Sequence, residues 1–272
     1  LDSKRKMDLT IDTYGYDIDR VSYEVRSLDT QRKIADTKIN DWSKDGNTWT
    51  KSLQIENLVD EGEEYLFILK LHCGSGNLYY YTRITLPEET YAKKCLEFTD
   101  QFHDVSMSDQ YETLASYLEP SEYTDKNDLG SVGIDSSIDQ VGWRGFNGTQ
   151  VGKPLVSFTD INDTYASLVY TYQMEEQNDG VSTYYNVEEY YKVRYTDLQI
   201  YLLDYKRTME QIVDVAAVGV SGNKLGVGIT NGDIEYLSNE TGTIVSFVQA
   251  GELFTYNQNK QTFTKVFGFV DD

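Results

Sequence analysis

Histidine and cysteine, the side chains most often used as general bases and nucleophiles, are scarce in this chain. It contains only two of each: His72, His103, Cys73 and Cys95. His72 and Cys73 are neighbours at the end of an expected strand, where adjacent side chains point to opposite faces, so they do not form a dyad. His103 falls in an expected helix, beside its apolar stripe. We therefore expect no catalytic residues and no cofactor. Two ordinary thiols are favoured for Cys73 and Cys95, with one disulfide bridge as the alternative.

The carboxylates give two weaker patterns. Asp125–Gly130 begins like an EF-hand loop, but Leu129 and Ser136 stand at its fifth and twelfth positions, and the twelfth needs a bidentate glutamate. We expect no metal site there. Glu189 and Asp204 lie on successive expected strands and are one possible pair for glycoside hydrolysis. A solvated sheet face is the simpler expectation for these charges.

Tyrosine is the most informative residue type. There are 23 tyrosines against 10 phenylalanines and 3 tryptophans, and many of them fall on three successive expected strands. Cross-strand aromatic pairs stabilise a sheet by about 0.2–1 kcal/mol each, which is the structural explanation. The functional alternative is an amphipathic wall for a ligand, because tyrosine combines a flat apolar face with a hydroxyl. The candidate ligand-binding residues are Trp143, Tyr170, Tyr172, Tyr185 and Tyr191.

These candidates are expected to surround a cavity. Alternation along the strands places Tyr170 and Tyr172 on one face, and Tyr185 and Tyr191 on another, and either face would serve as a wall. Trp143 is expected near the opening, with an exposed ring.

Composition excludes several classes of partner. The chain has 272 residues, a net charge of −21 and a pI near 4.4. Such a charge repels nucleic-acid phosphates and anionic lipid surfaces. Aromatic residues make up 13% of the chain, which argues against disorder. No apolar run of about 18 residues is present, so any membrane attachment requires a segment outside this sequence.

Residues 8–87 are predicted to form a β-sandwich, because short alternating strands recur with turn residues between them. The expected strands are Asp8–Tyr14, Asp19–Leu28, Lys33–Trp42, Thr48–Glu56, Glu64–Leu71 and Leu78–Leu86. Leu58, Glu61, Gly62 and Tyr65 resemble the motif that precedes the tyrosine-bearing strand of fibronectin type III and immunoglobulin-like modules, with one extra residue between Leu58 and Gly62. The resemblance implies a fold and no ligand.

Residues 88–213 change period and predict an α+β domain. Tyr91, Cys95, Phe98, Phe102 and Val105 recur at helical spacing, and Ser108–Leu118 forms a second expected helix. Long strands follow at Val132–Phe146, Leu155–Asp160, Thr164–Met174, Thr183–Thr196 and Gln199–Arg207. This order resembles the NTF2-like, or cystatin-like, fold, in which a curved sheet surrounds a cone-shaped cavity.

Residues 214–272 predict short strands separated by tight polar turns. The stretch from Thr243 to Phe263 resembles one blade of a β-propeller. A single blade leaves its sheet faces uncovered, so we expect the protein to continue beyond Asp272, with packing of this segment on the middle domain as the alternative. The fold class is thus mainly β, with an α+β middle.

The order of these three modules resembles uncharacterised extracytoplasmic proteins of Gram-positive gut bacteria. The stretches Val21–Asp29 and Tyr184–Tyr191 carry this resemblance. It implies a location at the cell surface, with membrane anchoring in the full-length protein. Together with the missing catalytic set, it leads us to expect a non-enzymatic binding or scaffold protein for a protein, peptide or glycan. A small-ligand or enzymatic NTF2-like pocket is one alternative, and a regulatory ectodomain of a membrane protein is another.

Overall fold

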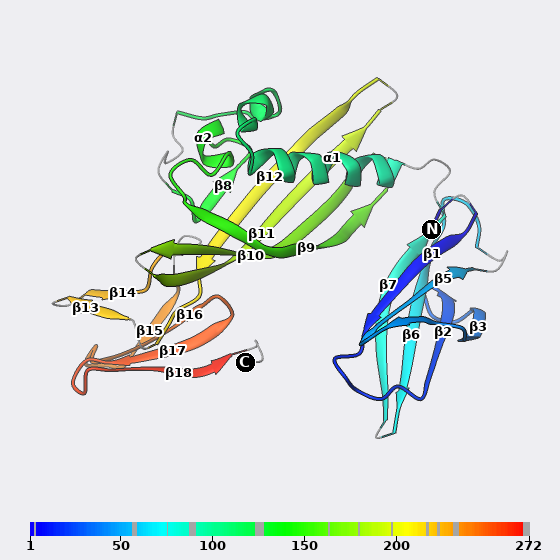
Figure 1. Cartoon of the computed structure of the whole chain (residues 1–272), viewed down its shortest axis with the longest axis horizontal. Helices are drawn as coiled ribbons and strands as arrows, with labels where there is room; N and C mark the ends of the chain where they lie inside the picture. The colour runs from blue at the N-terminus through cyan, green and yellow to red at the C-terminus, as the bar shows by residue number, and fades with distance from the viewer. Residues whose placement is uncertain are drawn as a thin grey trace. The chain divides into compact units, whose positions relative to one another are not determined.

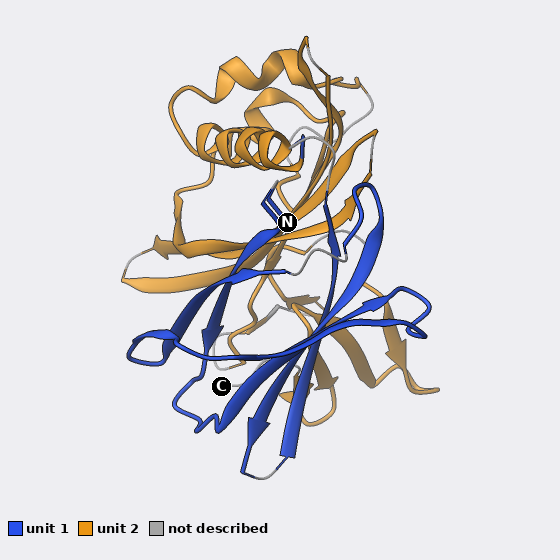
Figure 2. Cartoon of the chain, turned by 90° about the vertical axis from the view of Figure 1, so that its right-hand side faces the viewer, with its two compact units in different colours: residues 1–91 blue, residues 92–272 orange. Residues whose placement is uncertain are grey.

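The computed structural model divides the chain into two compact units, Leu1–Tyr91 and Ala92–Asp272 (Figure 2). It describes all residues except 3, 56–58, 75, 87–90, 123–127, 163, 179, 197, 216–217, 222–223, 231–233 and 269–272. Strands hold 57% of the chain and helices 11%, which confirms the mainly β class. The sheets are antiparallel. Within the described residues, no helix is long and apolar enough to cross a membrane.

Unit 1 is built from two sheets that share one core (Figure 1). The sheets have the orders β1-β5-β4 and β3-β2-β6-β7. Ile11 and Leu53 of the first sheet and Val25 and Phe67 of the second belong to one buried cluster. The strands are β1 (Lys6–Asp12), β2 (Arg20–Ser27), β3 (Lys33–Ile39), β4 (Ser43–Asp45), β5 (Thr48–Gln54), β6 (Glu64–Cys73) and β7 (Gly76–Thr85).

The strand predictions for unit 1 are confirmed to within a few residues, because period-2 alternation decides which side chains reach the core. The tyrosine of the fibronectin-like motif has a local role. The Tyr65 hydroxyl accepts a hydrogen bond from the backbone N–H of Asp60, at 3.1 Å. Leu58 of that motif lies outside the described residues.

Unit 2 contains a five-stranded sheet of order β8-β12-β11-β10-β9, and α1 lies across one face of it (Figure 1). We call this covered face the inner face and the opposite one the outer face. The elements are α1 (Tyr91–Ser106), a 3₁₀ helix (Tyr111–Tyr117), β8 (Ser131–Gly133), α2 (Ile138–Val141), β9 (Gly148–Ile161), β10 (Ala166–Asn178), β11 (Val181–Tyr195) and β12 (Ile200–Gln211).

Helix α1 was predicted at this position, but the stripe it buries differs from the predicted one. Its buried residues are Cys95, Thr99, Phe102, His103 and Ser106. The predicted stripe shares Cys95 and Phe102 with these, and its Phe98 and Val105 are half-buried against the same core. Thr99 and His103 are buried in addition because they bond Tyr170 and Glu189 of the sheet. The Phe102 ring packs 5.2 Å from that of Tyr205.

The predicted long strand Val132–Phe146 is wrong. The structure has the short strand β8 and the single-turn helix α2 in this segment. Ser137 starts α2 with a capping box, in which the Ser137 and Gln140 side chains each bond the other residue's backbone N–H. This local signal outweighs the apolar alternation of the segment.

The C-terminal residues of unit 2 form a small four-stranded sheet of order β15-β16-β17-β18 and a two-stranded ribbon, β13-β14. Phe247, Phe254 and Phe263 stack at the centre of its small core, which also includes Val213. The elements are β13 (Gly219–Ser221), β14 (Lys224–Gly226), β15 (Tyr236–Ser238), β16 (Ile244–Gln249), β17 (Glu252–Asn257) and β18 (Thr262–Gly268). The predicted boundary between residues 213 and 214 stays a prediction.

Candidate functional site

The inner face of the unit 2 sheet brings together the four tyrosines predicted as ligand-binding residues. Leu168 lies opposite Tyr191, Tyr172 opposite Val187, and Met174 opposite Tyr185. Tyr170 and Tyr191 are 5.2 Å apart between ring centroids. The prediction of two different faces is therefore wrong, because the hairpin register aligns the buried positions of both strands.

A buried carboxylate, Glu189, lies at the centre of this face. Its side chain is fully inaccessible to solvent. One carboxylate oxygen accepts hydrogen bonds from His103 Nδ1 and the Tyr191 hydroxyl, both at 2.7 Å. The other oxygen accepts from the hydroxyls of Tyr172 at 3.1 Å and Tyr205 at 3.4 Å. Four donors of the chain itself therefore satisfy this carboxylate.

The charges of this network support one another. Burial by itself raises the pKa of Glu189, but the hydrogen bond and charge of His103, helped by Arg207, lower its pKa overall. Burial likewise works to lower the pKa of His103, and the bond to Glu189 outweighs it, so that pKa is raised. His103 Nε2 also bonds Gln150 Oε1 at 2.9 Å. Both pKa shifts favour a charged His103–Glu189 pair in the folded chain.

Arg207 lies directly opposite Glu189 on β12 and fixes the segment that holds Trp143. Its guanidinium stacks 3.6 Å above the Trp143 ring, and its two terminal nitrogens donate to the carbonyls of Gln140 and Val141. Trp143 is only 6% exposed, so the expectation of an exposed ring is wrong. Among the described residues, Trp143 Nε1 and Arg207 Nε have no hydrogen-bond acceptor.

The remaining two candidate tyrosines also bond within the chain. The Tyr170 hydroxyl donates to Asp100 Oδ1 at 2.6 Å and lies 2.8 Å from Thr99 Oγ1. The Tyr185 hydroxyl donates to Glu176 Oε2 at 3.1 Å, and burial, followed by the charge of Glu176, raises its pKa to about 12. Each candidate tyrosine is thus a buried part of the core.

The other chemistry considered from the sequence does not come together. Asp204 is exposed on the outer face opposite Lys192, whereas Glu189 is buried on the inner face, so they form no glycosidase pair. The solvated-face expectation holds for Glu188 and is wrong for Glu189. Cys73 and Cys95 are free thiols.

No metal site is found either. The described residues contain no group of three or more side chains suited to a metal ion, and residues 125–127 of the EF-hand-like segment lie outside them.

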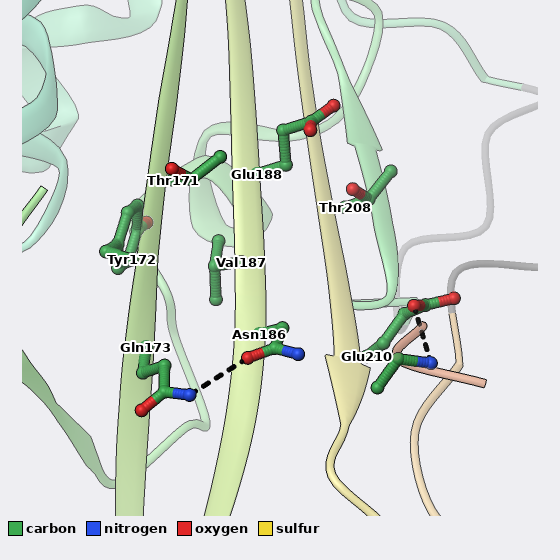
Figure 3. A pocket seen from close by; sticks show the side chains of 9 residues that line it. Thr171, Tyr172, Gln173, Asn186, Val187, Glu188, Thr208 and Glu210 are labelled. Carbon is green, nitrogen blue, oxygen red and sulfur yellow. Dashed lines mark hydrogen bonds between the residues drawn. The ribbon is translucent and has the colours of Figure 1, made fainter. Parts of the chain in front are cut away.

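The outer face of the same sheet holds an open cleft, which sequence reasoning missed. It encloses about 530 Å³ and is lined by Thr171, Tyr172, Gln173, Asn186, Val187, Glu188, Thr208, Glu210 and Ala250 (Figure 3). Tyr172 and Val187 are the two lining residues whose side chains are buried in the inner-face core. The polar members form two rows across the strands. Thr171, Glu188 and Thr208 are cross-strand partners in one row. Gln173, Asn186 and Glu210 are partners in the other.

Two contacts shape the floor and rim of this cleft (Figure 3). Gln173 Nε2 donates to Asn186 Oδ1 at 3.1 Å, which leaves the remaining amide groups free to face solvent. The backbone N–H of Ala250 donates to Glu210 Oε2 at 3.0 Å and brings the turn between β16 and β17 to the rim. Glu188 is exposed. The sequence predicted a solvated face for Glu188 but did not predict the rim, because Ala250 lies 40 residues after Glu210 in the chain.

Comparison with models of known families and with curated proteins found no match.

Proposed function

We propose that this chain is a non-enzymatic binding and scaffold module of an extracytoplasmic protein, and that its ligand occupies the outer-face cleft. In this proposal unit 1 is an immunoglobulin-like sandwich, and the helix on a curved sheet in unit 2 is an NTF2-like domain with a filled interior. The C-terminal sheet is the propeller-like module. The full-length protein would be attached to a membrane or cell wall.

The observation that carries the proposal is the complete hydrogen bonding of the buried Glu189 carboxylate. All four acceptor directions of Glu189 are used by His103 and three tyrosines, and the second His103 nitrogen bonds Gln150. General acid–base chemistry needs a group within hydrogen-bond reach of a substrate. A carboxylate with all its acceptor positions filled by the chain instead fixes one packing arrangement of the core.

In the outer-face cleft, by contrast, polar side chains face solvent. Its walls present two carboxylates, two amides and two threonine hydroxyls on a rigid sheet, and the described lining includes no basic side chain. Acceptors of this kind bind ligands that carry hydrogen-bond donors, and the carboxylates favour a positive charge. We therefore assign a lysine-bearing peptide segment of a protein partner to the cleft, in preference to a neutral glycan.

NMR titration of the full ¹⁵N-labelled chain with trilysine and, separately, with chitotriose tests this assignment. We expect trilysine to shift the amides of Asn186, Glu188 and Thr208, with an affinity that falls as salt is added. Glu188→Gln should weaken binding roughly twofold to fivefold, the worth of one exposed charge pair.

The matched control is Glu61→Gln, which removes one charge from unit 1 and should leave binding unchanged. Shifts with chitotriose alone would assign the cleft to glycans. Shifts confined to inner-face residues, or none with either probe, would overturn the binding proposal.

A small-ligand pocket inside unit 2 is the second candidate, and one observation favours it. Trp143 Nε1 and Arg207 Nε are buried donors without an acceptor among the described residues. Buried polar groups of this kind call for an unseen partner, such as a water molecule or a ligand oxygen. Mass spectrometry of the chain released from its native state tests this, because a co-purified small molecule would support an interior pocket.

A further inference from the structure

Strand β7 forms one edge of the four-stranded sheet of unit 1 and pairs only with β6 among the described strands (Figure 1). Eight consecutive residues, 76–83, are exposed. Four of them are large and apolar or aromatic: Leu78 is 53% exposed, Tyr79 47%, Tyr80 56% and Tyr81 63%. At the end of the strand, the Thr85 carbonyl accepts a hydrogen bond from the Leu1 amino group. The open edge therefore lies before Thr85.

The opposite edge of the same sheet, β3, carries the usual protection against association. Lys33, Asp36 and Lys38 place charges along it, and a register shift between Val25 and Arg26 distorts its pairing with β2. Charges and bulges on an edge strand disfavour pairing with another chain. Strand β7 has neither device from Gly76 to Thr82, and its pairing with β6 runs without a register shift.

Both faces of β7 are open near its centre. Tyr80 lies opposite Leu69 and Leu78 opposite Leu71, which places them on the core side of the sheet, beyond the reach of the second sheet. Tyr79 and Tyr81 lie on the other side, opposite Lys70 and Ile68. A strand added beside β7 would thus cover apolar surface on both faces, in addition to the backbone hydrogen bonds.

We propose that β7 is a self-association edge, on which the β7 strand of a second copy of this chain pairs antiparallel around a two-fold axis at Tyr80. This inference is independent of the cleft. With Tyr80 on the axis, Tyr79 faces Tyr81 of the second copy, Leu78 faces Thr82, and Asn77 faces Arg83. Aromatic pairs of this kind stabilise sheets, and no like charges meet.

Charge favours this occupant. Two copies that each carry a net charge of −21 repel one another over most surfaces. Strand β7 contains no acidic residue and one arginine, so it is a segment where two copies approach with little repulsion. A two-fold contact of one strand buries less than a standard interface, so the dimer is weak and is seen only at high protein concentration.

Sedimentation equilibrium from about 10 µM to about 1 mM tests this edge, a range that brackets a weak interface. We expect concentration-dependent dimers of the native chain. Tyr80→Lys places two ammonium groups on the axis and should weaken dimerisation roughly tenfold, the factor that about 1.4 kcal/mol produces. Tyr16→Lys is the matched control, because Tyr16 is 77% exposed in a loop and the charge change is the same. It should leave dimerisation intact.

A second variant keeps the test valid if Tyr80→Lys disturbs folding. Tyr80→Cys should form an interchain disulfide on mild oxidation, since cross-strand Cα atoms at the axis lie within disulfide reach. Tyr16→Cys should not. A native chain that stays monomeric at the highest concentration, or equal behaviour of the position 80 and position 16 variants, would overturn the proposal. A monomer that binds a foreign extended peptide along β7 would overturn the second copy as its occupant.

Discussion

The two faces of the unit 2 sheet are made by alternate residues of the same strands, yet their chemistry is opposite. On β11, Glu189 is buried and receives four hydrogen bonds, whereas its neighbour Glu188 is exposed in an open cleft. The same alternation separates Tyr172 from Thr171 and Arg207 from Thr208. The inner face holds more titratable side chains, but they form hydrogen bonds and charge pairs with one another. The outer face holds fewer titratable groups, and these face the open cleft. A concentration of titratable groups therefore does not by itself locate a binding site.

The largest difference between the two faces is expected when the buried Glu189 carboxylate is removed. Glu189→Ala leaves His103 Nδ1 and three tyrosine hydroxyls without their acceptor in the core, and it removes the negative charge opposite Arg207. Breaking a buried charge pair by removing one partner costs about 3–5 kcal/mol. We expect a loss of this size in the free energy of unfolding of unit 2, measured by urea unfolding of the full chain with near-UV circular dichroism.

Glu188→Ala is the matched control for that variant, one residue away on the outer face. Exposed substitutions of this kind change stability by about 0.5 kcal/mol or less. Equal unfolding curves for the two variants would mean that the inner network is not a core element.

Trp143→Ala tests the rim of the inner face. The ring is buried and stacks on Arg207, so its loss should lower stability by about 3 kcal/mol, near the lower end for a large aromatic residue. Binding of trilysine by the folded fraction should not change. Trp143→Phe should recover part of the stability. A nearly unchanged melt together with lost affinity would restore Trp143 as a ligand contact.

Tyr191→Phe removes one hydroxyl from Glu189 and leaves the aromatic packing in place. A hydrogen bond to a charged group contributes about 1.5–3 kcal/mol, so the variant should be destabilised by an amount in this range. Tyr184→Phe is the control, because the Tyr184 hydroxyl bonds Glu175 on the exposed outer face. If the two variants melt alike, the Glu189 network is less tightly coupled than its distances indicate.

The same network makes stability depend on pH in a direction that can be derived. The pKa of His103 is raised from 6.5 in the folded chain, so its contribution is complete below about pH 6.5 and is lost as the pH rises through the raised pKa. The pKa of Glu189 is lowered from 4.5, so its contribution is complete above about pH 4.5 and is lost as the pH falls through the lowered pKa. The network therefore stabilises unit 2 most between about pH 4.5 and 6.5.

His103→Gln isolates the alkaline half of this profile. Asp104, Tyr170 and Tyr172 also surround the imidazole, and they remain in the variant. We expect the native chain to lose stability from about pH 6.5 upward and the variant to show a flatter profile over that range. Chemical denaturation at a series of pH values measures both slopes. An equally steep alkaline loss in the variant would assign the slope to other groups.

The sequence predicted what depends on local periodicity. Alternation around Tyr170 and Tyr191 gave the strands of the sheet, and helical spacing of Cys95 and Phe102 gave α1. Contacts between distant segments could not be predicted from the sequence. Glu189, for example, is bonded in the core by His103, which lies 86 residues away in the chain. In the segment after Val132, apolar alternation misled, although the Ser137–Gln140 capping box was a readable helix signal. The cleft was missed because its rim residue, Ala250, comes from the C-terminal sheet.

The reaction rates of the two free thiols test whether solvent reaches the inner face, and they do so without a substitution in the protein. Cys95 is buried on the side of α1 that faces the sheet, and burial raises the pKa of its thiol to about 11. Cys73 in unit 1 is half-buried and serves as an internal reference. The thiolate is the reactive form, so a buried, high-pKa thiol reacts slowly with a disulfide reagent. We expect one thiol to react in the native chain and two after unfolding, with mass mapping of the modified peptide to identify Cys73 as the first.

Glu189→Ala should speed the reaction of Cys95, because the loosened inner face opens more often. Equal native rates for both thiols would mean that the inner face is open to solvent, and the interior would then return as a place for a ligand.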